Sequence, residues 1–282
     1  MASLNLHGGV SSRGEPFDVK AAIRQLDAAV ICLQETWLPA SRDGPPGQAV
    51  RSADPDPSAD AMAVAGRASA DRRGPGQYGS RRSGAEAQPG WHSDHIAAAA
   101  VELGAAVYRA PLGEGPSLAS FGIPAESGPG QLSIAVLTTV AVTSYEVVEL
   151  GQIAGDNVPR LAQVILLELP GRPALRLVNT HLTHRLASPL QLYRLWRHLD
   201  AEPLPTIIAG DLNMPRFLAS RLPGYFAVVN GRTWPADQPL VQLDHVLVSQ
   251  DIGGMDGAVL PATGSDHLPI RAHLWLRLSG AS

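Results

Sequence analysis

Side chains that can do acid–base or metal chemistry recur in this chain where short apolar runs end. The residues so placed are Asn5, Glu35, His181, Asp211, Asn213, Asp244, Asp266 and His267. Apolar runs of this length are typical of buried strands, and strand ends in two packed sheets meet at a common rim. We therefore expect these side chains, although far apart in the sequence, to form one site.

The carboxylates in this set predict a metal ion. Several carboxylates at the edge of a core repel one another, and they stay ionised most readily when a cation lies between them. Oxygen ligands from Glu, Asp and Asn suit a hard cation such as Mg²⁺ or Mn²⁺. Cys32 is the only cysteine, which excludes a cysteine-based zinc cluster. A hard cation can polarise a phosphoryl oxygen and stabilise a leaving alkoxide.

Two of the motifs have a specific chemical interpretation. In Gly210-Asp211-Leu212-Asn213 the Asp and the Asn are two residues apart, so they point to one side of an extended chain. His267 precedes an apolar run, and an imidazole held by a second carboxylate, for which Asp244 is the candidate, can act as general base for water. The alternatives are a turn with Asx hydrogen bonds for the first motif, and a capping Asp with a surface His for the second.

The elements expected to position these residues are mostly strands. Helices are expected over 18–28, capped by Asp18, over 94–103, with Ser93 as the cap and Gly104 as the stop, and over 188–199. Strands are expected over 29–33, 105–108, 132–137, 141–150, 161–169, 175–178, 206–209, 246–248 and 270–276. Many strands with few helices indicate two packed sheets with helices outside.

Residues 39–90 differ from the rest of the chain. They are rich in Pro, Gly, Ser, Ala, Arg and Asp and show little periodicity, which is typical of a disordered insertion. The alternative is a mobile arm that contacts substrate, for which Arg72-Arg73 and Arg81-Arg82 would supply positive charge. Because no other linker or repeat is evident, residues 1–282 are expected to form one domain with this insertion.

Composition narrows the class of protein. A length of 282 residues and a hydrophobic content of 45% are sufficient for a large core. The net charge of −4 and the single lysine, Lys20, do not favour broad binding to duplex DNA. No apolar run is long enough to span a bilayer and no secretory leader is evident, so the expected location is the cytoplasm, with a monomer as the default.

The motifs resemble those of the endonuclease/exonuclease/phosphatase family. The matching pieces, in family order, are Asn5-Leu6-His7-Gly8-Gly9, Leu33-Gln34-Glu35-Thr36-Trp37, Asn179-Thr180-His181-Leu182, Gly210-Asp211-Leu212-Asn213, Leu243-Asp244-His245-Val246-Leu247 and Ser265-Asp266-His267-Leu268-Pro269. They span essentially the whole chain, and ordered motifs are far more specific than any one of them. The resemblance implies an α+β fold, a four-layer αββα sandwich of two packed, mostly antiparallel sheets with outer helices and the site at their rim.

The resemblance also implies metal ligands and a base. Glu35 is similar to the family's principal metal ligand, with Asn5 and Asp266 close to the ion. His267 resembles the residue that activates water, and Asp244 resembles the residue that orients it. The implied cofactor is Mg²⁺ or Mn²⁺.

The remaining roles concern the phosphate. Asp211 and Asn213 resemble the pair that positions the attacking water and the phosphate, and His181 resembles the phosphate-binding histidine. The implied chemistry is in-line attack of water on a phosphoester without a covalent enzyme intermediate. Whether Asp211 or His181 protonates the leaving group stays open.

The expected function is that of a metal-dependent hydrolase of phosphoester bonds, in the first place a phosphodiesterase or nuclease acting on nucleic acid. A phosphomonoesterase or a hydrolase of phospholipids or sugar phosphates is the alternative within the same chemistry, and a non-catalytic binding protein on this scaffold is a third. Trp234 is a candidate to stack on a base or sugar of the substrate, with a half-buried structural role as the alternative. Tyr145 is expected to pack within a strand.

The sequence supports only weaker predictions for other polar residues near the motifs. Arg160, Arg185 and Arg216 flank the motifs, and any of them could contact a phosphate. His7 is expected to be a solvent, capping or packing histidine, and so are the remaining histidines outside the site, of which His184 is close enough to His181 in the sequence to assist a phosphate.

Overall fold

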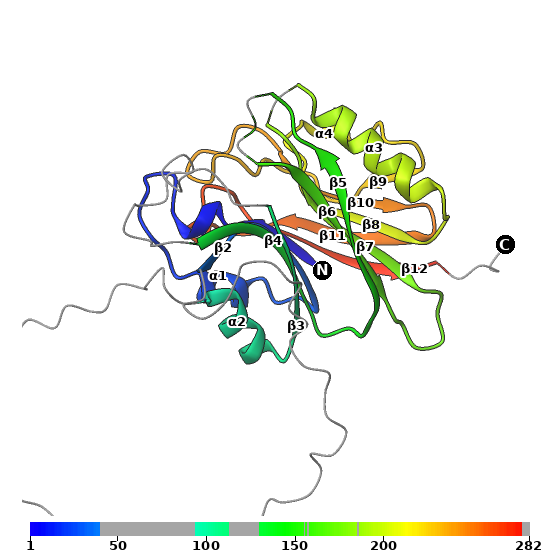
Figure 1. Ribbon diagram of the computed structural model, residues 1–282, viewed down its shortest axis with the longest axis horizontal. Helices are drawn as coiled ribbons and strands as arrows, with labels where there is room; N and C mark the ends of the chain where they lie inside the picture. Colours follow the sequence, from blue (N-terminus) through cyan, green and yellow to red (C-terminus); the bar gives the residue numbers. More distant parts are fainter. Residues whose placement is uncertain (40–93, 113–129, 155, 157, 185, 278–282) are drawn as a thin grey trace, which may run out of the picture.

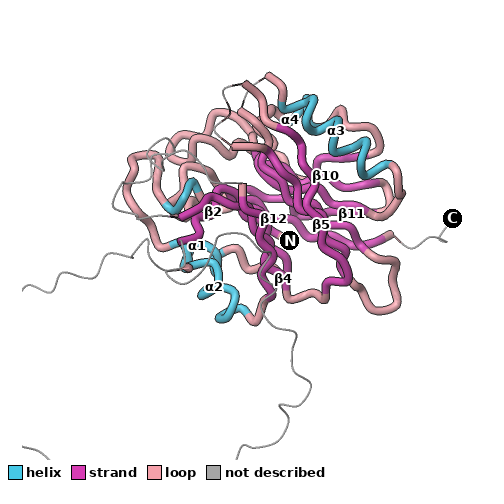
Figure 2. The backbone as a smooth tube through the Cα atoms, viewed as in Figure 1, coloured by secondary structure: helices cyan, strands magenta, loops and turns pink. Residues whose placement is uncertain are grey.

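A computed structural model describes residues 1–39, 94–112, 130–154, 156, 158–184 and 186–277. In these residues the strands form two six-stranded sheets packed face to face (Figure 1; Figure 2). The first sheet contains β1 (Ala2–Asn5), β2 (Val30–Pro39), β3 (Ala106–Pro111), β4 (Gly130–Thr138), β11 (Ile252–Val259) and β12 (Ile270–Leu276). The second contains β5 (Val142–Gly151), β6 (Arg160–Leu167), β7 (Leu175–His181), β8 (Thr206–Asp211), β9 (Tyr225–Ala227) and β10 (Asp244–Ser249).

The strand order explains how distant motifs come together. It is β11-β12-β1-β2-β4-β3 in the first sheet and β5-β6-β7-β8-β10-β9 in the second. The neighbours β1 and β2 are parallel, and so are β7 and β8, while the other described pairs are antiparallel. The first and last parts of the chain therefore share one sheet, and the prediction of two mostly antiparallel sheets is confirmed.

Helices cover the outer face of each sheet, which gives the predicted four layers. α1 (Val19–Gln25) and α2 (His95–Leu103) lie on the first sheet, and α3 (Ser188–Asp200) and α4 (Arg216–Ala219) lie on the second (Figure 1). A short 3-10 helix, η1 (His7–Gly9), follows β1. One buried apolar cluster lies under α1 and α2, a second fills the space between the sheets, and a third lies under α3 and α4.

The helix ends follow the sequence with one correction. Asp18 caps α1 by accepting a hydrogen bond from a backbone N–H of the first turn, as predicted. Ser93 lies outside the described residues, and the cap of α2 is Asp94, whose side chain accepts from the first turn at 2.9 Å. Either residue type can cap a helix. Gly104 ends α2 with a φ of 61°, a conformation that costs glycine little.

Four described elements were not predicted from the sequence, namely η1, α4, β9 and β11. α4 and β9 contain four and three residues, too few for a periodic pattern. β11 contains three glycines, which are poor strand formers. It becomes a strand because it pairs with β12 along most of its length, which is a tertiary contact rather than a local preference.

The predicted insertion at 39–90 lies almost entirely outside the described residues, which omit 40–93. The insertion, its Arg72-Arg73 and Arg81-Arg82 pairs, and the single domain that it would interrupt therefore stay predictions. Within the described part of the chain, no helix is both long and apolar enough to cross a membrane.

Candidate active site

Glu35 leaves the regular course of β2 at an irregularity in the strand. The pairing of β2 with β4 shifts register between Leu33 and Thr36, and Glu35 has a positive φ of 47°. A bulge of this kind re-aims a side chain, and a left-handed conformation costs a non-glycine residue about 1–3 kcal/mol. The carboxylate reaches the second sheet, where Oε1 lies 3.6 Å from His181 Nδ1.

Three candidate residues lie side by side on adjacent strands of the second sheet. His181 pairs with Asp211 in the parallel β7–β8 register, and Asp211 pairs with Asp244 in the antiparallel β8–β10 register. Residues opposite each other on neighbouring strands point to the same face of the sheet. Gly210 permits this close pairing: with a φ of 140°, a Cβ there would lie 2.0 Å from the carbonyl oxygen of Thr180.

Asp211 connects the two sheets. Asn5 Nδ2, at the end of β1, donates to Asp211 Oδ2 at 3.1 Å. The same oxygen lies 3.5 Å from His181 Nε2 and 3.7 Å from His267 Nε2. Burial raises the pKa of Asp211 to about 7, although the neighbouring His267 acts in the opposite direction. In the metal-free protein this carboxyl is therefore partly protonated near neutral pH.

Asn213 forms the turn that follows β8. Its φ is 50°, and its backbone N–H donates to Asp211 Oδ1 at 2.9 Å, which is an Asx hydrogen bond. Its side-chain Nδ2 donates to the Leu182 carbonyl oxygen at 3.0 Å and lies 3.1 Å from His181 Nε2. The turn that the sequence offered as an alternative to a functional motif is thus present, and it also holds an amide against His181.

The hydrogen bonds of His181 fix its tautomer. Because the Asn213 amide nitrogen can only donate, His181 Nε2 accepts, and the proton of the neutral ring lies on Nδ1. Nδ1 has no hydrogen-bond partner among the described residues and faces Glu35. Burial, with repulsion from the Arg160 charge, holds the pKa of His181 well below its usual range. A neutral N–H donor therefore points into the space beside Glu35.

His267 and Asp244 form a buried imidazole–carboxylate pair. His267 Nδ1 donates to Asp244 Oδ2 at 2.8 Å, and Asp244 is fully buried. Burial by itself lowers the pKa of His267, but Asp244 and Asp211 outweigh it and raise this pKa to about 10. Ser265 holds the loop in place, because its Oγ donates to the Asn5 carbonyl oxygen at 2.6 Å and accepts from the His267 N–H at 3.2 Å.

Asp266 contacts two residues at the rim. Trp234 Nε1 donates to Asp266 Oδ2 at 3.2 Å, and His7 Nδ1 lies 3.6 Å from Oδ1. Trp234 is 38% exposed, so much of its ring is open to solvent. Sequence reasoning missed the place of His7 at the site. Its position two residues after Asn5, in the same motif, was the available signal.

An amide network sets the separation of the two sheets behind the site. Asn179 Nδ2 donates to two backbone carbonyl oxygens of the first sheet at 3.1 and 3.0 Å, and Gln34 Nε2 donates to Asn179 Oδ1 at 2.7 Å. Buried polar groups that are fully hydrogen-bonded make a core rigid. Gln34 precedes Glu35 and Asn179 lies two residues before His181, so the network fixes both sides of the site.

The cluster offers ligand atoms that could hold a cation. Asp211, Asp244 and His267 each offer one ligand atom, and these atoms lie within 4.8 Å of one another. Glu35 also belongs to this crowded group, since burial raises its pKa and Asp266 adds to the effect. A cation relieves such crowding. Asp244 Oδ1 has no hydrogen-bond partner among the described residues, whereas both Asp211 oxygens already accept hydrogen bonds, from Asn5 and Asn213.

The eight residues Asn5, Glu35, His181, Asp211, Asn213, Asp244, Asp266 and His267 therefore gather at one end of the sandwich, although their individual roles stay predictions. Arg185 lies outside the described residues. A model of the Endonuclease/Exonuclease/phosphatase family matches residues 2–267. The chain belongs to this family. Its members are phosphoesterases, and the resemblance seen in the motifs is confirmed. A sequence comparison with curated proteins finds no match.

Solved structures of the endonuclease/exonuclease/phosphatase family share the fold. A family protein from Beutenbergia cavernae is 17% identical with a TM-score of 0.64, over 100% of this chain and 72% of that one. The mannosyl-6-phosphatase Bt3783 of Bacteroides thetaiotaomicron is 13% identical with a TM-score of 0.61, over 98% of both chains. The human Nocturnin catalytic domain is 15% identical with a TM-score of 0.59, over 98% and 93%. At such identities the likeness concerns the fold.

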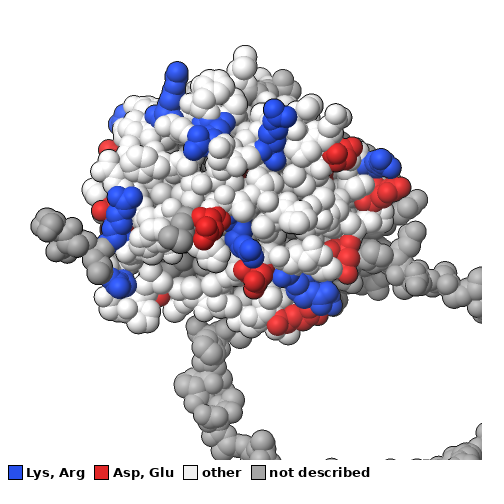
Figure 3. Space-filling model, turned by 180° about the vertical axis from the view of Figure 1, so that it is seen from behind, with Lys and Arg blue, Asp and Glu red and all other residues white. Residues whose placement is uncertain are grey.

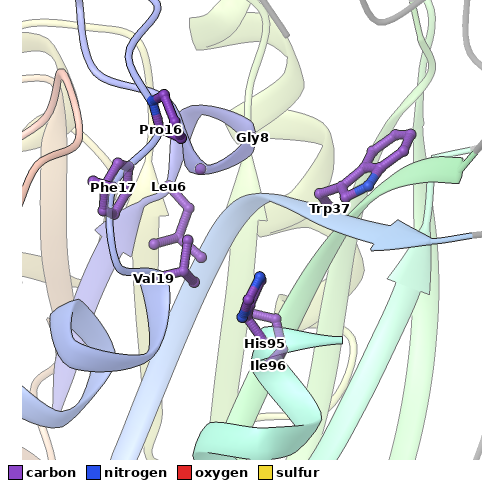
Figure 4. A pocket seen from close by; sticks show the side chains of 9 residues that line it. Leu6, Gly8, Pro16, Phe17, Val19, Trp37, His95 and Ile96 are labelled. Carbon is purple, nitrogen blue, oxygen red and sulfur yellow. The ribbon is translucent and has the colours of Figure 1, made fainter. Parts of the chain in front are cut away.

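An apolar pocket lies beside this family site rather than within it. Figure 4 shows Leu6 and Phe17 on one side of the pocket and Trp37 on the other. Leu6 follows Asn5, and Trp37 lies two residues after Glu35, but none of the candidate site residues lines the pocket. The pocket offers apolar contact next to the rim and has no carboxylate for metal chemistry.

Proposed function

We propose that this chain is a metal-dependent phosphodiesterase that drives water in line onto phosphorus. The observation that carries the proposal is the His267 imidazole, hydrogen-bonded to Asp244 at 2.8 Å with its other nitrogen 3.7 Å from Asp211. An imidazole in this setting is suited to remove a proton from water. Phosphoryl transfer depends mainly on positioning and charge stabilisation, which does not require a covalent nucleophile.

The base is His267 Nε2, which takes a proton from the attacking water. Asp244 holds the ring through Nδ1 and stabilises the imidazolium that forms. Because a base must be deprotonated, the pKa of His267, about 10 in the metal-free protein, has to be lower in the working enzyme. Asn213 positions a phosphate oxygen, and His181 donates its Nδ1–H to the phosphoryl group.

Glu35, with Asn5 and Asp266, would hold Mg²⁺ or Mn²⁺. Asn5 Oδ1 accepts one hydrogen bond from the His7 N–H at 2.9 Å and keeps a second lone pair. The Trp234 N–H holds Asp266 at the rim. When bound, the ion would polarise a phosphoryl oxygen and stabilise the leaving alkoxide.

The leaving oxygen needs a proton, and we assign its transfer to Asp211. The pKa of Asp211 is raised by burial to about 7, so the carboxyl can carry a proton near neutral pH. The pKa of His181 lies well below its usual range, which makes its neutral ring a poor acid. His181 is better suited to bind the phosphate than to protonate the leaving group.

Short or single-stranded nucleic acid is the first substrate class to test. Figure 3 shows Lys and Arg interspersed with Asp and Glu on one face of the protein, without a continuous basic surface there. With a net charge of −4, this distribution does not favour long duplexes, which need many cationic phosphate contacts. The partly exposed Trp234 is suited to stack on a base.

Hydrolysis of a phosphomonoester is the second candidate. The observation in its favour is again that the face in Figure 3 has no continuous basic surface, because a small monoester needs only the contacts of the site itself. The two candidates share their catalytic residues and differ at phosphorus, which carries two ester groups in a diester and one in a monoester.

A panel of substrates tests the proposal. The purified protein is incubated with single-stranded DNA, RNA, supercoiled DNA, a generic phosphodiester and a phosphomonoester, each with Mg²⁺, Mn²⁺ or a chelator. We expect metal-dependent cleavage of diesters that the chelator abolishes. Release of phosphate from the monoester alone would favour the second candidate. Binding without hydrolysis in every condition would favour a non-catalytic protein.

A further inference from the structure

We propose that Arg160 binds the substrate phosphate in this site, through contact of its guanidinium with a non-bridging phosphoryl oxygen. The inference rests on the proposed function and adds a cationic contact to it. Arg160 is the first residue of β6, and its side chain is 7% exposed. A guanidinium stays charged even when it is buried, so it needs partners.

The described residues around Arg160 accept few of the hydrogen bonds that its guanidinium can donate. Arg160 Nη2 lies 3.9 Å from Asp156 Oδ1, which is too long for a hydrogen bond. Both Asp156 oxygens are already engaged, because Oδ1 accepts from Thr183 Oγ1 at 2.6 Å and Oδ2 accepts from the Ile153 N–H at 3.3 Å. Among the described residues, Arg160 Nε has no hydrogen-bond partner at all.

Arg176 on the neighbouring strand β7 shows the contrast. Its side chain is 6% exposed, and its Nη1 and Nη2 donate to the carbonyl oxygens of Leu199 at 2.9 Å and Glu202 at 2.6 Å. The two arginines are similarly buried, but of the two only Arg176 donates to carbonyl oxygens of the described residues. A buried donor without an acceptor is costly and persists where a ligand or a function compensates for it.

Arg160 lies beside the His181 end of β7, because β6 and β7 pair antiparallel with Ala162 opposite Thr180. Its positive charge contributes to the low pKa of His181 and partly offsets the rise that burial causes in the pKa of Glu35. His181 Nδ1 is a second buried donor without a hydrogen-bond partner among the described residues. Two such donors, one of them charged, beside a group of carboxylates are what a phosphoryl group bridging to a cation would require.

The shape of the guanidinium also fits this role. During in-line attack, negative charge spreads over the non-bridging oxygens, and a planar fork of N–H donors can hold two acceptors at once. A lysine keeps the charge but loses the fork. Arg160 is therefore expected to affect both phosphate affinity and kcat, while leaving the metal ligands untouched.

The test compares Arg160→Gln and Arg160→Lys with the matched control Arg176→Lys. Titration calorimetry measures the binding of Mn²⁺ and then of inorganic phosphate to the Mn²⁺-loaded protein, and a generic phosphodiester reports kcat/KM. We expect Arg160→Gln to weaken phosphate binding about 10- to 100-fold and to lower kcat/KM at least as much, with Mn²⁺ affinity kept within about threefold. Arg160→Lys should show a smaller loss. Arg176→Lys should alter only thermal stability.

The outcomes separate this inference from the proposed function. If the wild type is an active Mn²⁺-dependent phosphodiesterase and both Arg160 variants bind phosphate as tightly as it does, Arg160 is a structural partner of Asp156 and the inference is wrong. If the wild type neither binds phosphate nor hydrolyses any ester, the proposed function fails and the inference fails with it. Should Arg160→Gln not fold, Arg160→Lys decides the question.

Discussion

The two buried histidines of the site differ in chemistry because their neighbours differ. His181 and His267 are each 5% exposed, and both have Nε2 near Asp211 Oδ2, at 3.5 and 3.7 Å. His267 donates its other nitrogen to Asp244, and its pKa is raised to about 10. His181 has an amide at Nε2 and no carboxylate hydrogen bond, and its pKa is lowered. One ring is built to exchange protons and the other to stay neutral.

This contrast divides the site into two sides. On the His267 side, carboxylates surround an imidazole and prepare it to act on water. On the His181 side, an amide, a neutral imidazole and the Arg160 guanidinium provide hydrogen-bond donors whose protonation state does not change near pH 7. Equal burial thus produces a base on one side and a phosphate-binding surface on the other.

The largest expected effect is the loss of the base. His267→Gln should lower kcat for a phosphodiester about 10³- to 10⁴-fold, whereas His181→Gln, which keeps a neutral donor, should lower it only about 10- to 100-fold. Steady-state kinetics with Mn²⁺ measures both values, and circular dichroism checks folding. Equal losses in the two variants would remove the distinction between the sides.

Asp211→Asn tests the proton donor that lies between the two histidines. The amide cannot transfer a proton, so kcat should fall about 10²- to 10³-fold for a poor leaving group such as a methyl alkoxide. A nitrophenyl ester, whose leaving group needs no proton, should lose at least tenfold less. The ratio of the two losses is the measurement, and a ratio near one would assign the acid elsewhere.

Asp244→Asn should lower kcat about 10²-fold and change how stability depends on pH. The raised pKa of His267 adds stability to the metal-free protein that is complete below about pH 6.5 and is lost as the pH rises through about 10. Wild-type protein in chelator should therefore lose thermal stability across this window. The variant should lose less, because the main group that raises the pKa of His267 is gone. Identical slopes in thermal unfolding would contradict the account.

The smallest expected effect is at the rim. Trp234→Phe keeps most of the ring and removes the hydrogen bond to Asp266, and we expect kcat/KM to fall no more than about fivefold. Trp234→Ala should cost more with single-stranded DNA than with a generic phosphodiester, because only the former offers a base to stack. Equal losses on the two substrates would make Trp234 a structural residue.

The sequence predicted the strands of this fold well where local pattern decides them. The apolar runs over 29–33 and 206–209 lie in buried strands, although β2 continues past Glu35 to Pro39 instead of ending at the site. The glycine-rich β11 could not be found in this way, since its pairing with β12 depends on contacts between distant segments. Order along the chain, rather than any one motif, is what identified the family.

The site was predictable in membership but not in geometry. Glu35 and Asn213 both adopt a positive φ, which no propensity predicts for these residue types, and this conformation aims their side chains. His7 was set aside because a lone histidine is usually structural, yet it lies 3.6 Å from Asp266. That Arg160 Nε has no hydrogen-bond partner among the described residues is likewise a consequence of packing. Residue types reveal which chemistry is available, and backbone geometry determines which atoms meet.

The binding of Mn²⁺ to metal-free protein, measured by titration calorimetry, tests the central division of the site most directly. Glu35→Gln removes the proposed principal ligand and should weaken binding at least tenfold, while His267→Gln should leave the affinity within about threefold. The opposite result, with binding lost in His267→Gln and kept in Glu35→Gln, would place the ion on Asp211, Asp244 and His267. It would then be the His267 side that holds the metal, and the assignment of His267 as the base would be wrong.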